Sequence, residues 1–140
     1  MIYALTLAMG ACSDRPRADA SNTEQVAHGK RVYEARCSSC HGAKLEGQPN
    51  WRERLPSGKF PAPPHDASGH TWHHPDALLF DIVKNSIERH APPGYRSDMP
   101  AFGKMLSDEE IWAALAYIKS TWPAEMRDMQ AEVTRNAAQR

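Results

Sequence analysis

Cys37-Ser38-Ser39-Cys40-His41 is the stretch of this sequence on which the predicted fold depends. Two cysteines separated by two residues lie close together on one turn of chain, and a histidine directly after the second projects beside them. This arrangement suits covalent attachment of haem: the thiols of Cys37 and Cys40 add to the porphyrin vinyl groups, and the imidazole of His41 reaches the iron from one face. The pentapeptide therefore predicts a covalent haem site.

Two other interpretations of the cysteine pair fit less well. A zinc site would need a second Cys/His pair at metal-ligand spacing, and no cysteine follows Cys40. A thioredoxin-like redox pair would need a strand–helix–strand context, which is missing, and would not need the adjacent histidine. Haem attachment is the interpretation that uses both thiols and the imidazole.

The composition sets broad limits on the fold and on the partners. A chain of 140 residues supports one domain with additional terminal segments. Hydrophobic residues make up 41% of it, which permits a core, but 11 prolines and 8 glycines predict much irregular structure. A central haem would add a large apolar body to such a core. The formal net charge of zero argues against nucleic acid as a partner, because phosphate binding favours a basic excess.

The N-terminal residues have features of an export signal. Residues 1–11 are almost entirely apolar but too few to span a bilayer, and no Lys or Arg precedes them. Met9-Gly10-Ala11-Cys12 looks like a bacterial lipoprotein processing site, although Met9 stands where that pattern usually has leucine. We expect cleavage before Cys12 and lipid on its thiol; the alternative is an ordinary secreted protein with an incidental cysteine. Residues 12–21 are expected to form a flexible tether.

Helix signals occur in three places. Near the C-terminal end, Ser107 and Glu110 have the spacing of a capping box. Apolar residues then recur at i, i+4, i+7 and i+11 as one continuous stripe of Ile111, Leu115, Ile118 and Trp122. An earlier helix is predicted to start after Ser21 or Asn22, and another to run over residues 75–87.

Residues 42–69 show no sustained periodicity and are rich in proline and glycine, so they are predicted to form a long loop. We expect this loop to cover the haem face bound by His41, with Leu45, Trp51, Leu55 and Phe60 as candidate lining residues. The carbonyl of Pro49 is a candidate acceptor for the Nδ1–H of His41, a bond that would leave Nε2 for the iron. The alternative, a turn proline with no special partner, stays open.

His70, Trp72, His73 and His74 form a second concentration of ligand-type side chains. His73 and His74 are consecutive, and no helical motif of carboxylate and histidine surrounds them, so the spacing does not favour a metal site. We interpret the histidines as polar loop residues. Trp72 is expected to pack at the haem edge, where its indole N–H is free to bond a haem propionate.

Three stretches together resemble class I c-type cytochromes, above all the small single-haem proteins of bacteria: Cys37–His41, Asp98–Gly103 and Leu106–Trp112. The resemblance runs from about Asn22 to Trp122. It implies an all-α class I cytochrome c fold, in which three to five helices and long irregular loops wrap around one covalently bound haem. The cytochrome c domain would span residues 22–122, and residues 123–140 would form a weakly helical C-terminal extension outside the core.

The resemblance also implies roles for individual residues. The two cysteines of the pentapeptide hold the haem c, its histidine is the proximal iron ligand and Met99 is the distal one, with Met105 as the weaker candidate. A thioether favours ferrous iron relative to a second imidazole and so raises the reduction potential. Gly29 and Tyr33, one turn apart, would let the first helix cross closely against the last.

Iron that the protein holds on both faces has no open position for a substrate or dioxygen. We therefore expect an electron-transfer haem protein, not an enzyme, that cycles between ferric and ferrous iron in the bacterial periplasm. Its partners would be a redox donor and acceptor bound through a small transient interface, and the membrane through the lipid anchor. Two alternatives stay open: a haem enzyme or gas sensor with a displaceable sixth ligand, and an electron-entry subunit of a larger oxidoreductase complex.

Overall fold

The computed structural model describes residues 17–139, and all regular structure within them is helical. The α-helices are α1 (Thr23–Arg36), α2 (Ser38–His41), α3 (Asp76–Asn85), α4 (Asp108–Ser120) and α5 (Ala124–Ala138). Three single turns of 3-10 helix lie between them: η1 (Thr71–His73), η2 (Ile87–Arg89) and η3 (Phe102–Lys104). The described part of the chain contains no β-strand, so the all-α prediction is confirmed.

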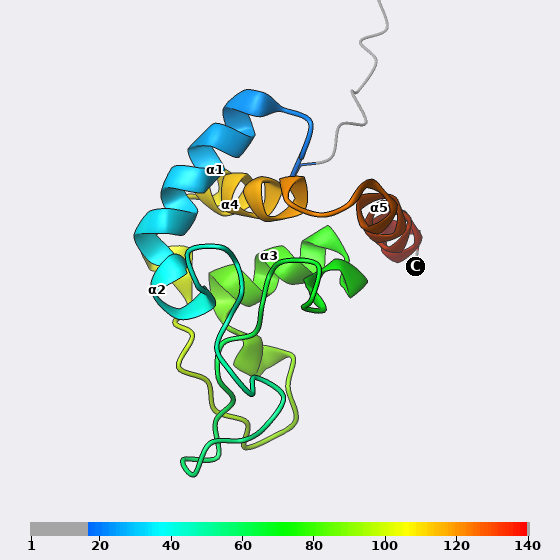
Figure 1. Cartoon of the computed structure of the whole chain (residues 1–140). Helices are drawn as coiled ribbons and strands as arrows, with labels where there is room; N and C mark the ends of the chain where they lie inside the picture. The colour runs from blue at the N-terminus through cyan, green and yellow to red at the C-terminus, as the bar shows by residue number, and fades with distance from the viewer. Residues whose placement is uncertain (1–16, 140) are drawn as a thin grey trace, which may run out of the picture.

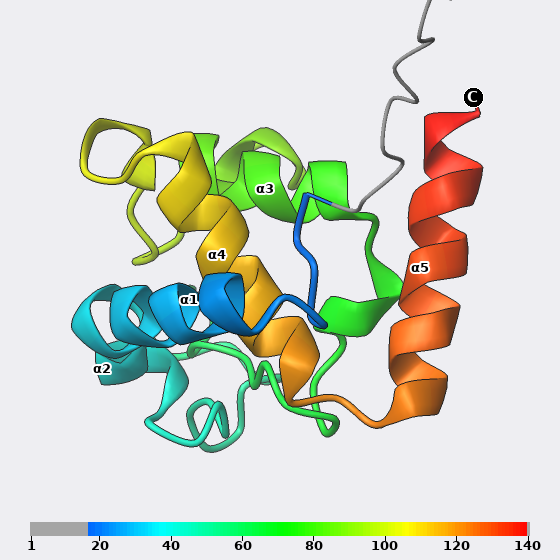
Figure 2. The same ribbon diagram turned by 90° about the horizontal axis from the view of Figure 1, so that it is seen from above.

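The crossing of α1 over α4 is the most extensive helix contact of the fold (Figures 1 and 2). α1 begins after Asn22, whose side chain accepts a hydrogen bond from the backbone N–H of Gln25 at 3.0 Å. Gly29 lies at the crossing point, where a Cβ atom would come within 3.0 Å of the Ala114 nitrogen and still closer to the Ala113 carbonyl. The two backbones therefore meet without an intervening side chain, as the sequence predicted for Gly29.

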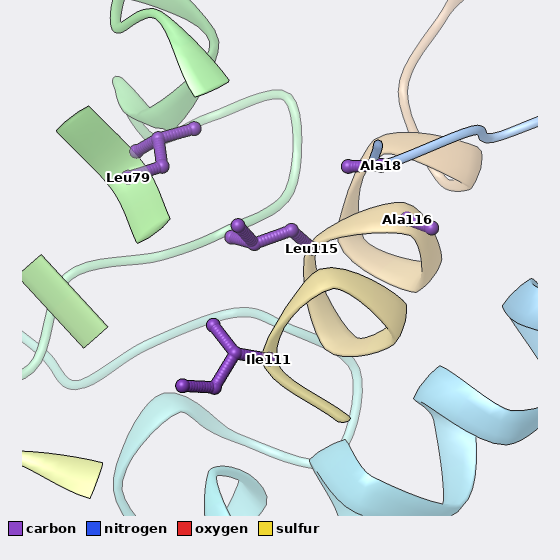
Figure 3. Close-up of a cluster of buried hydrophobic side chains, with 5 residues drawn as sticks. All are labelled: Ala18, Leu79, Ile111, Leu115 and Ala116. Carbon is purple, nitrogen blue, oxygen red and sulfur yellow. The ribbon is translucent and has the colours of Figure 1, made fainter. Parts of the chain in front are cut away.

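The apolar stripe of α4 divides between two hydrophobic clusters. Ile111 and Leu115 belong to the first cluster, in which Figure 3 shows Leu115 of α4 extending toward Leu79 of α3; the buried members of this cluster are Ala18, Leu79, Ile111, Leu115 and Ala116. The second cluster contains Tyr33, Leu45, Ile118 and Trp122, which are 6% exposed or less. All four residues of the predicted stripe are thus buried, and they join α1, α3 and the loop after α2 into one core.

Residues 17–21 differ from the predicted tether. Ala18 is only 1% exposed and packs in the first cluster, while the Gln25 side chain bonds to the Arg17 carbonyl at 2.7 Å and to the Asp19 N–H at 2.9 Å. This part of the expected tether is therefore docked on the fold, because a small apolar side chain and two hydrogen bonds fix it. Cys12 and the predicted export signal lie outside the described residues.

The C-terminal extension also differs from the weak, peripheral helix that we expected. α5 is a full helix of 15 residues that packs beside η1, along one side of the molecule in Figure 2. Gln130 of α5 is completely buried, and its amide donates to the His74 carbonyl at 3.1 Å and to an Asp76 carboxylate oxygen at 2.7 Å. Polar contacts, which apolar periodicity does not reveal, attach this helix.

Asp76 is the centre of that buried polar network. The ammonium of Lys119 on α4 donates to both Asp76 carboxylate oxygens at 2.9 Å, and the two side chains are 8–9% exposed. The Asp76 N–H donates to the Thr134 hydroxyl of α5 at 3.1 Å. Since Pro75, the residue before α3, provides no side-chain cap, Thr134 satisfies a free N–H group at the start of that helix. One carboxylate thus connects α3, α4 and α5.

Replacing Ser107 by alanine tests the cap of α4. The Ser107 hydroxyl accepts from the Glu110 N–H at 3.2 Å, and the Glu110 carboxylate accepts from the Ser107 N–H at 2.8 Å, so the predicted capping box is confirmed. We expect Ser107→Ala to lower the free energy of unfolding by about 1 kcal/mol, because one helix N–H loses its acceptor. Chemical denaturation of the holoprotein measures this, and an unchanged midpoint would contradict it.

Among residues 17–139, no helix is long and apolar enough to cross a membrane.

Candidate functional site

The pentapeptide forms one compact turn at the end of α1. The N–H of Cys37 still bonds to the Tyr33 carbonyl at 2.8 Å, and the N–H of His41 bonds back to the Cys37 carbonyl at 2.9 Å. Cys37 is partly buried and Cys40 is exposed, and both are free thiols. Burial, together with the nearby Cys40, raises the pKa of the Cys37 thiol to about 11. Neither cysteine forms a disulfide, and both belong to the turn that also contains His41.

His41 is buried and has a fixed tautomer. Its side chain is 6% exposed, and its Nδ1 lies 2.8 Å from the carbonyl oxygen of Pro63. Because a carbonyl only accepts, Nδ1 carries the proton and Nε2 keeps its lone pair. Burial lowers the pKa of His41, and the weaker opposite effect of the bond to Pro63 does not reverse this. The ring is thus a neutral imidazole with one nitrogen available to a metal.

Pro63, and not Pro49, is the residue that orients His41. The prediction of a carbonyl partner was right, but Pro49 is exposed and the chain brings a later proline to the ring. Two backbone hydrogen bonds bring Pro63 to the His41 ring: the Gly47 N–H donates to the His41 carbonyl at 2.7 Å, and the Gln48 N–H donates to the Ala62 carbonyl at 2.9 Å. A Cβ atom on Gly47, which has φ +68°, would overlap the backbone where Pro63 joins Pro64. Only glycine allows this close approach.

A second imidazole covers one face of His41. The ring of His65 stacks on it with a centroid distance of 4.1 Å and an interplanar angle of 27°. His65 is itself fixed, because its Nδ1 lies 2.8 Å from the Thr71 hydroxyl and its carbonyl accepts from the Trp122 indole at 2.8 Å. Burial lowers the pKa of His65 well below its usual value, so this ring is also neutral. No spacing or motif in the sequence predicts this contact.

Trp72 packs close to the pentapeptide, and its N–H has an acceptor within the protein. Its ring lies against the second cluster, which Cys37 also contacts. The indole N–H donates to the Gly69 carbonyl at 3.2 Å, three residues earlier in the same turn. This acceptor lies close in the chain, and the bond to a haem propionate stays a prediction.

The other residues predicted to line or surround the site differ in their burial and in the side chains that they contact. Of the four candidate lining residues only Leu45 is buried, whereas Trp51 stacks on His70, Phe60 stacks on Tyr95, and Leu55 is 44% exposed. His70, His73 and His74 lie near one another, yet residues 17–139 contain no group of three His, Cys, Asp or Glu side chains that could hold a metal ion.

Met99 lies in the irregular segment between η2 and η3. Its side chain is partly buried, and its N–H donates to the Ser97 hydroxyl at 3.1 Å. Met105, the weaker candidate ligand, lies at the end of η3 and is 48% exposed. Met99 is therefore the more buried of the two methionines, and its role as iron ligand stays a prediction.

The donor set fits a covalently attached haem. Two free thiols in one turn and a neutral imidazole with an available Nε2 are what attachment and proximal ligation require. Residues 24–118 match the family model described as "Cytochrome C oxidase, cbb3-type, subunit III". The chain belongs to this family of c-type cytochromes. It is an electron-transfer protein that carries covalently bound haem c.

The cytochrome is also similar to cytochrome c-555 of Prosthecochloris aestuarii. The two are 29% identical over 103 residues, which cover 66% of this chain and 84% of the relative. No solved structure matches the chain.

Proposed function

We propose that Cys37 and Cys40 form the two thioether bonds to the haem, that Nε2 of His41 is the proximal ligand, and that the sulfur of Met99 is the distal ligand. The single observation that supports this most directly is the 2.8 Å contact between His41 Nδ1 and the Pro63 carbonyl, since it prepares Nε2 for iron. A haem held by these residues would supply one-electron chemistry, through its ferric and ferrous states.

In this proposal the chain would supply both ligands to the iron, from His41 and Met99. His41 is held by Pro63 on one side and by the ring of His65 on another, so its imidazole has little freedom to move. With a thioether as the second ligand, no position remains for a substrate. We infer a carrier that exchanges electrons with a redox donor and acceptor and does not transform a substrate itself.

The family match supports a more specific role. Because the matching family model is described as a subunit of a cbb3-type cytochrome c oxidase, we propose electron entry into a larger oxidase complex as the second candidate function. An oxidase that copurifies with the membrane-bound cytochrome and stays bound during a mild high-salt wash would show a permanent subunit. Loss of the oxidase in that wash would show a weakly bound carrier.

We further propose export to the bacterial periplasm with a lipid anchor on Cys12. Support comes from the apolar residues 1–11 and the small residues before Cys12. Mass spectrometry of the N-terminal peptide from membranes should show acyl chains on Cys12. In Cys12→Ser the cytochrome should be found in the soluble fraction, and an unchanged membrane content would contradict the anchor.

Replacing Met99 by alanine is the direct test of the axial ligands. The ferric parent should show the weak near-infrared band of sulfur bonded to iron, and Met99→Ala should lose that band completely. The reduction potential should fall, since the ligand that favours ferrous iron is gone. The reduced variant should also bind carbon monoxide rapidly, whereas the parent should resist it.

Met105→Ala is the matched control, because it removes a methionine that is 48% exposed and lies six residues further along the chain. It should keep both the band and the resistance to carbon monoxide. A band that survives in Met99→Ala would exclude Met99 as ligand. Rapid carbon monoxide binding by the parent itself would favour a gas sensor or haem enzyme.

A further inference from the structure

Two hydrogen bonds in series connect η2 to the backbone of Met99. The carboxylate of Glu88, in η2, accepts from the Ser97 N–H at 2.9 Å. The hydroxyl of Ser97 then accepts from the Met99 N–H at 3.1 Å. The segment that carries Met99 is otherwise irregular, so it has no helical ladder of its own to hold these N–H groups. Glu88 and Ser97 supply the missing acceptors.

Further contacts hold Glu88 in place in addition to its bond with Ser97. Its N–H donates to the Ser86 hydroxyl at 3.2 Å, which caps η2. The backbone of Ser86 has φ +92°, a left-handed conformation that turns the chain sharply at the end of α3. The guanidinium of Arg96 lies 3.5 Å from the other carboxylate oxygen of Glu88. The acceptor for Ser97 is therefore prepared by contacts on both sides.

A second attachment reaches the same segment from the long loop. The ammonium of Lys59 pairs with the carboxylate of Asp98, directly before Met99, and the rings of Phe60 and Tyr95 stack with centroids 6.3 Å apart. The Asp98 side chain is 73% exposed, so solvent screens this ion pair. The Glu88 carboxylate is 35% exposed and bonds to a partly buried N–H. The attachment through Glu88 is thus the stronger of the two.

We propose that Glu88 is a positioning residue for Met99, which holds the methionine segment closed and so determines how rarely its sulfur leaves the iron. The proposal rests on the assignment of Met99 as distal ligand under the proposed function. A thioether is an uncharged ligand on an irregular segment, and its effective strength depends on how far that segment is ordered before ligation. Glu88 touches neither the haem nor the thioether in this account and acts only through Ser97.

The test compares carbon monoxide binding by the reduced holoprotein of four chains at pH 7. Glu88→Ala removes the acceptor, Glu88→Gln keeps an oxygen that can still accept from the Ser97 N–H, and Glu132→Ala removes an exposed carboxylate on α5. We expect the association rate to rise about tenfold in Glu88→Ala, since loss of a hydrogen bond to a charged group changes an opening equilibrium by at least that factor. Glu132→Ala should remain close to the parent, and Glu88→Gln, which keeps an uncharged acceptor, should have a rate between those of the parent and Glu88→Ala.

The ferric near-infrared band gives an independent measurement on the same proteins. In Glu88→Ala the band should disappear at lower denaturant concentration than the loss of helical circular dichroism, because the segment opens before the fold does. Coincident loss of both signals would reduce Glu88 to a general structural role and overturn the proposal. Equal carbon monoxide rates in Glu88→Ala and the parent, or equally raised rates in Glu88→Ala and Glu88→Gln, would also overturn it.

Failure of this proposal is distinguishable from failure of the proposed function. If Met99→Ala loses the band but Glu88→Ala behaves as the parent, the ligand assignment stands and the role of Glu88 is excluded. If Met99→Ala keeps the band, the ligand assignment itself fails, and the role of Glu88 fails with it. Should Glu88→Ala not fold, Ser97→Ala removes the second bond of the series and must raise the carbon monoxide rate in its place.

Discussion

Replacing Gly29 by alanine is expected to lower the free energy of unfolding by about 3 kcal/mol or more. On an exposed helix face the same change would stabilise the helix by about 1 kcal/mol. Here the new methyl group would overlap the Ala113 carbonyl and come within 3.0 Å of the Ala114 nitrogen. Backbone atoms cannot rotate away as a side chain can, so α1 and α4 must separate, and overpacking of this kind is costly.

Thermal unfolding of the holoprotein measures this effect. A loss of 3 kcal/mol corresponds to a decrease in Tm of roughly 10 °C for a domain of this size. Gly58→Ala is the control: Gly58 lies in a loop with a positive φ, +81°, unlike the helical Gly29, and no atom lies within 4 Å of the added carbon. It should cost only about 1 kcal/mol, through backbone strain alone. Equal Tm values for the two variants would show that the helices do not meet at Gly29.

The second large effect is expected from Lys119→Met. This change leaves the buried carboxylate of Asp76 without its cation, although the Gln130 amide still donates to it. Removing one partner of a buried ion pair typically costs about 3–5 kcal/mol, because the remaining charge is isolated from water. Asp76 also lies at the first turn of α3 and contacts α5. The variant should therefore lose more protection from amide hydrogen exchange in α3 and α5 than in α1.

Two further variants separate the charge effect from general damage. Lys84→Met removes the partner of Asp108 in a solvent-exposed pair, in which the two side chains are 34% and 54% exposed, and should change stability by less than about 1 kcal/mol. Asp76→Leu combined with Lys119→Met removes both buried charges and should recover part of the loss. A single Lys119→Met variant as stable as Lys84→Met would rule out the central role given to this pair.

The functional core of the site was accessible from the sequence because its signals are local. The pentapeptide of residues 37–41 lies within one turn of chain, so its geometry depends on neighbouring residues alone. Asn22 bonds to the N–H of Gln25, three positions away, and the capping box of α4 spans the same distance. The family resemblance gave the fold and the electron-transfer function, which the comparisons confirm.

The contacts that the sequence did not reveal are made between distant residues. The partner of His41 is 22 positions away, and every backbone carbonyl of the loop, those of Pro49 and Pro63 included, is an acceptor of the same kind. His65 and His41 stack because the Leu45 carbonyl accepts from the His65 N–H at 2.8 Å, a contact that no spacing rule describes. Glu88 and Ser97 are nine positions apart on either side of an irregular turn. In each of these cases the two partners follow no periodic pattern, so the sequence does not predict their contact.

By itself the sequence determined the covalent haem motif, the helices with their caps, the apolar stripe of α4 and the family of the protein. Only the tertiary structure decided which carbonyl orients His41, how α5 is attached, and what holds the segment of Met99. The physical reason is that capping and helical periodicity depend on atoms a few residues apart. Gln130, by contrast, reaches Asp76 across 54 positions, and only the folded chain brings those two side chains together.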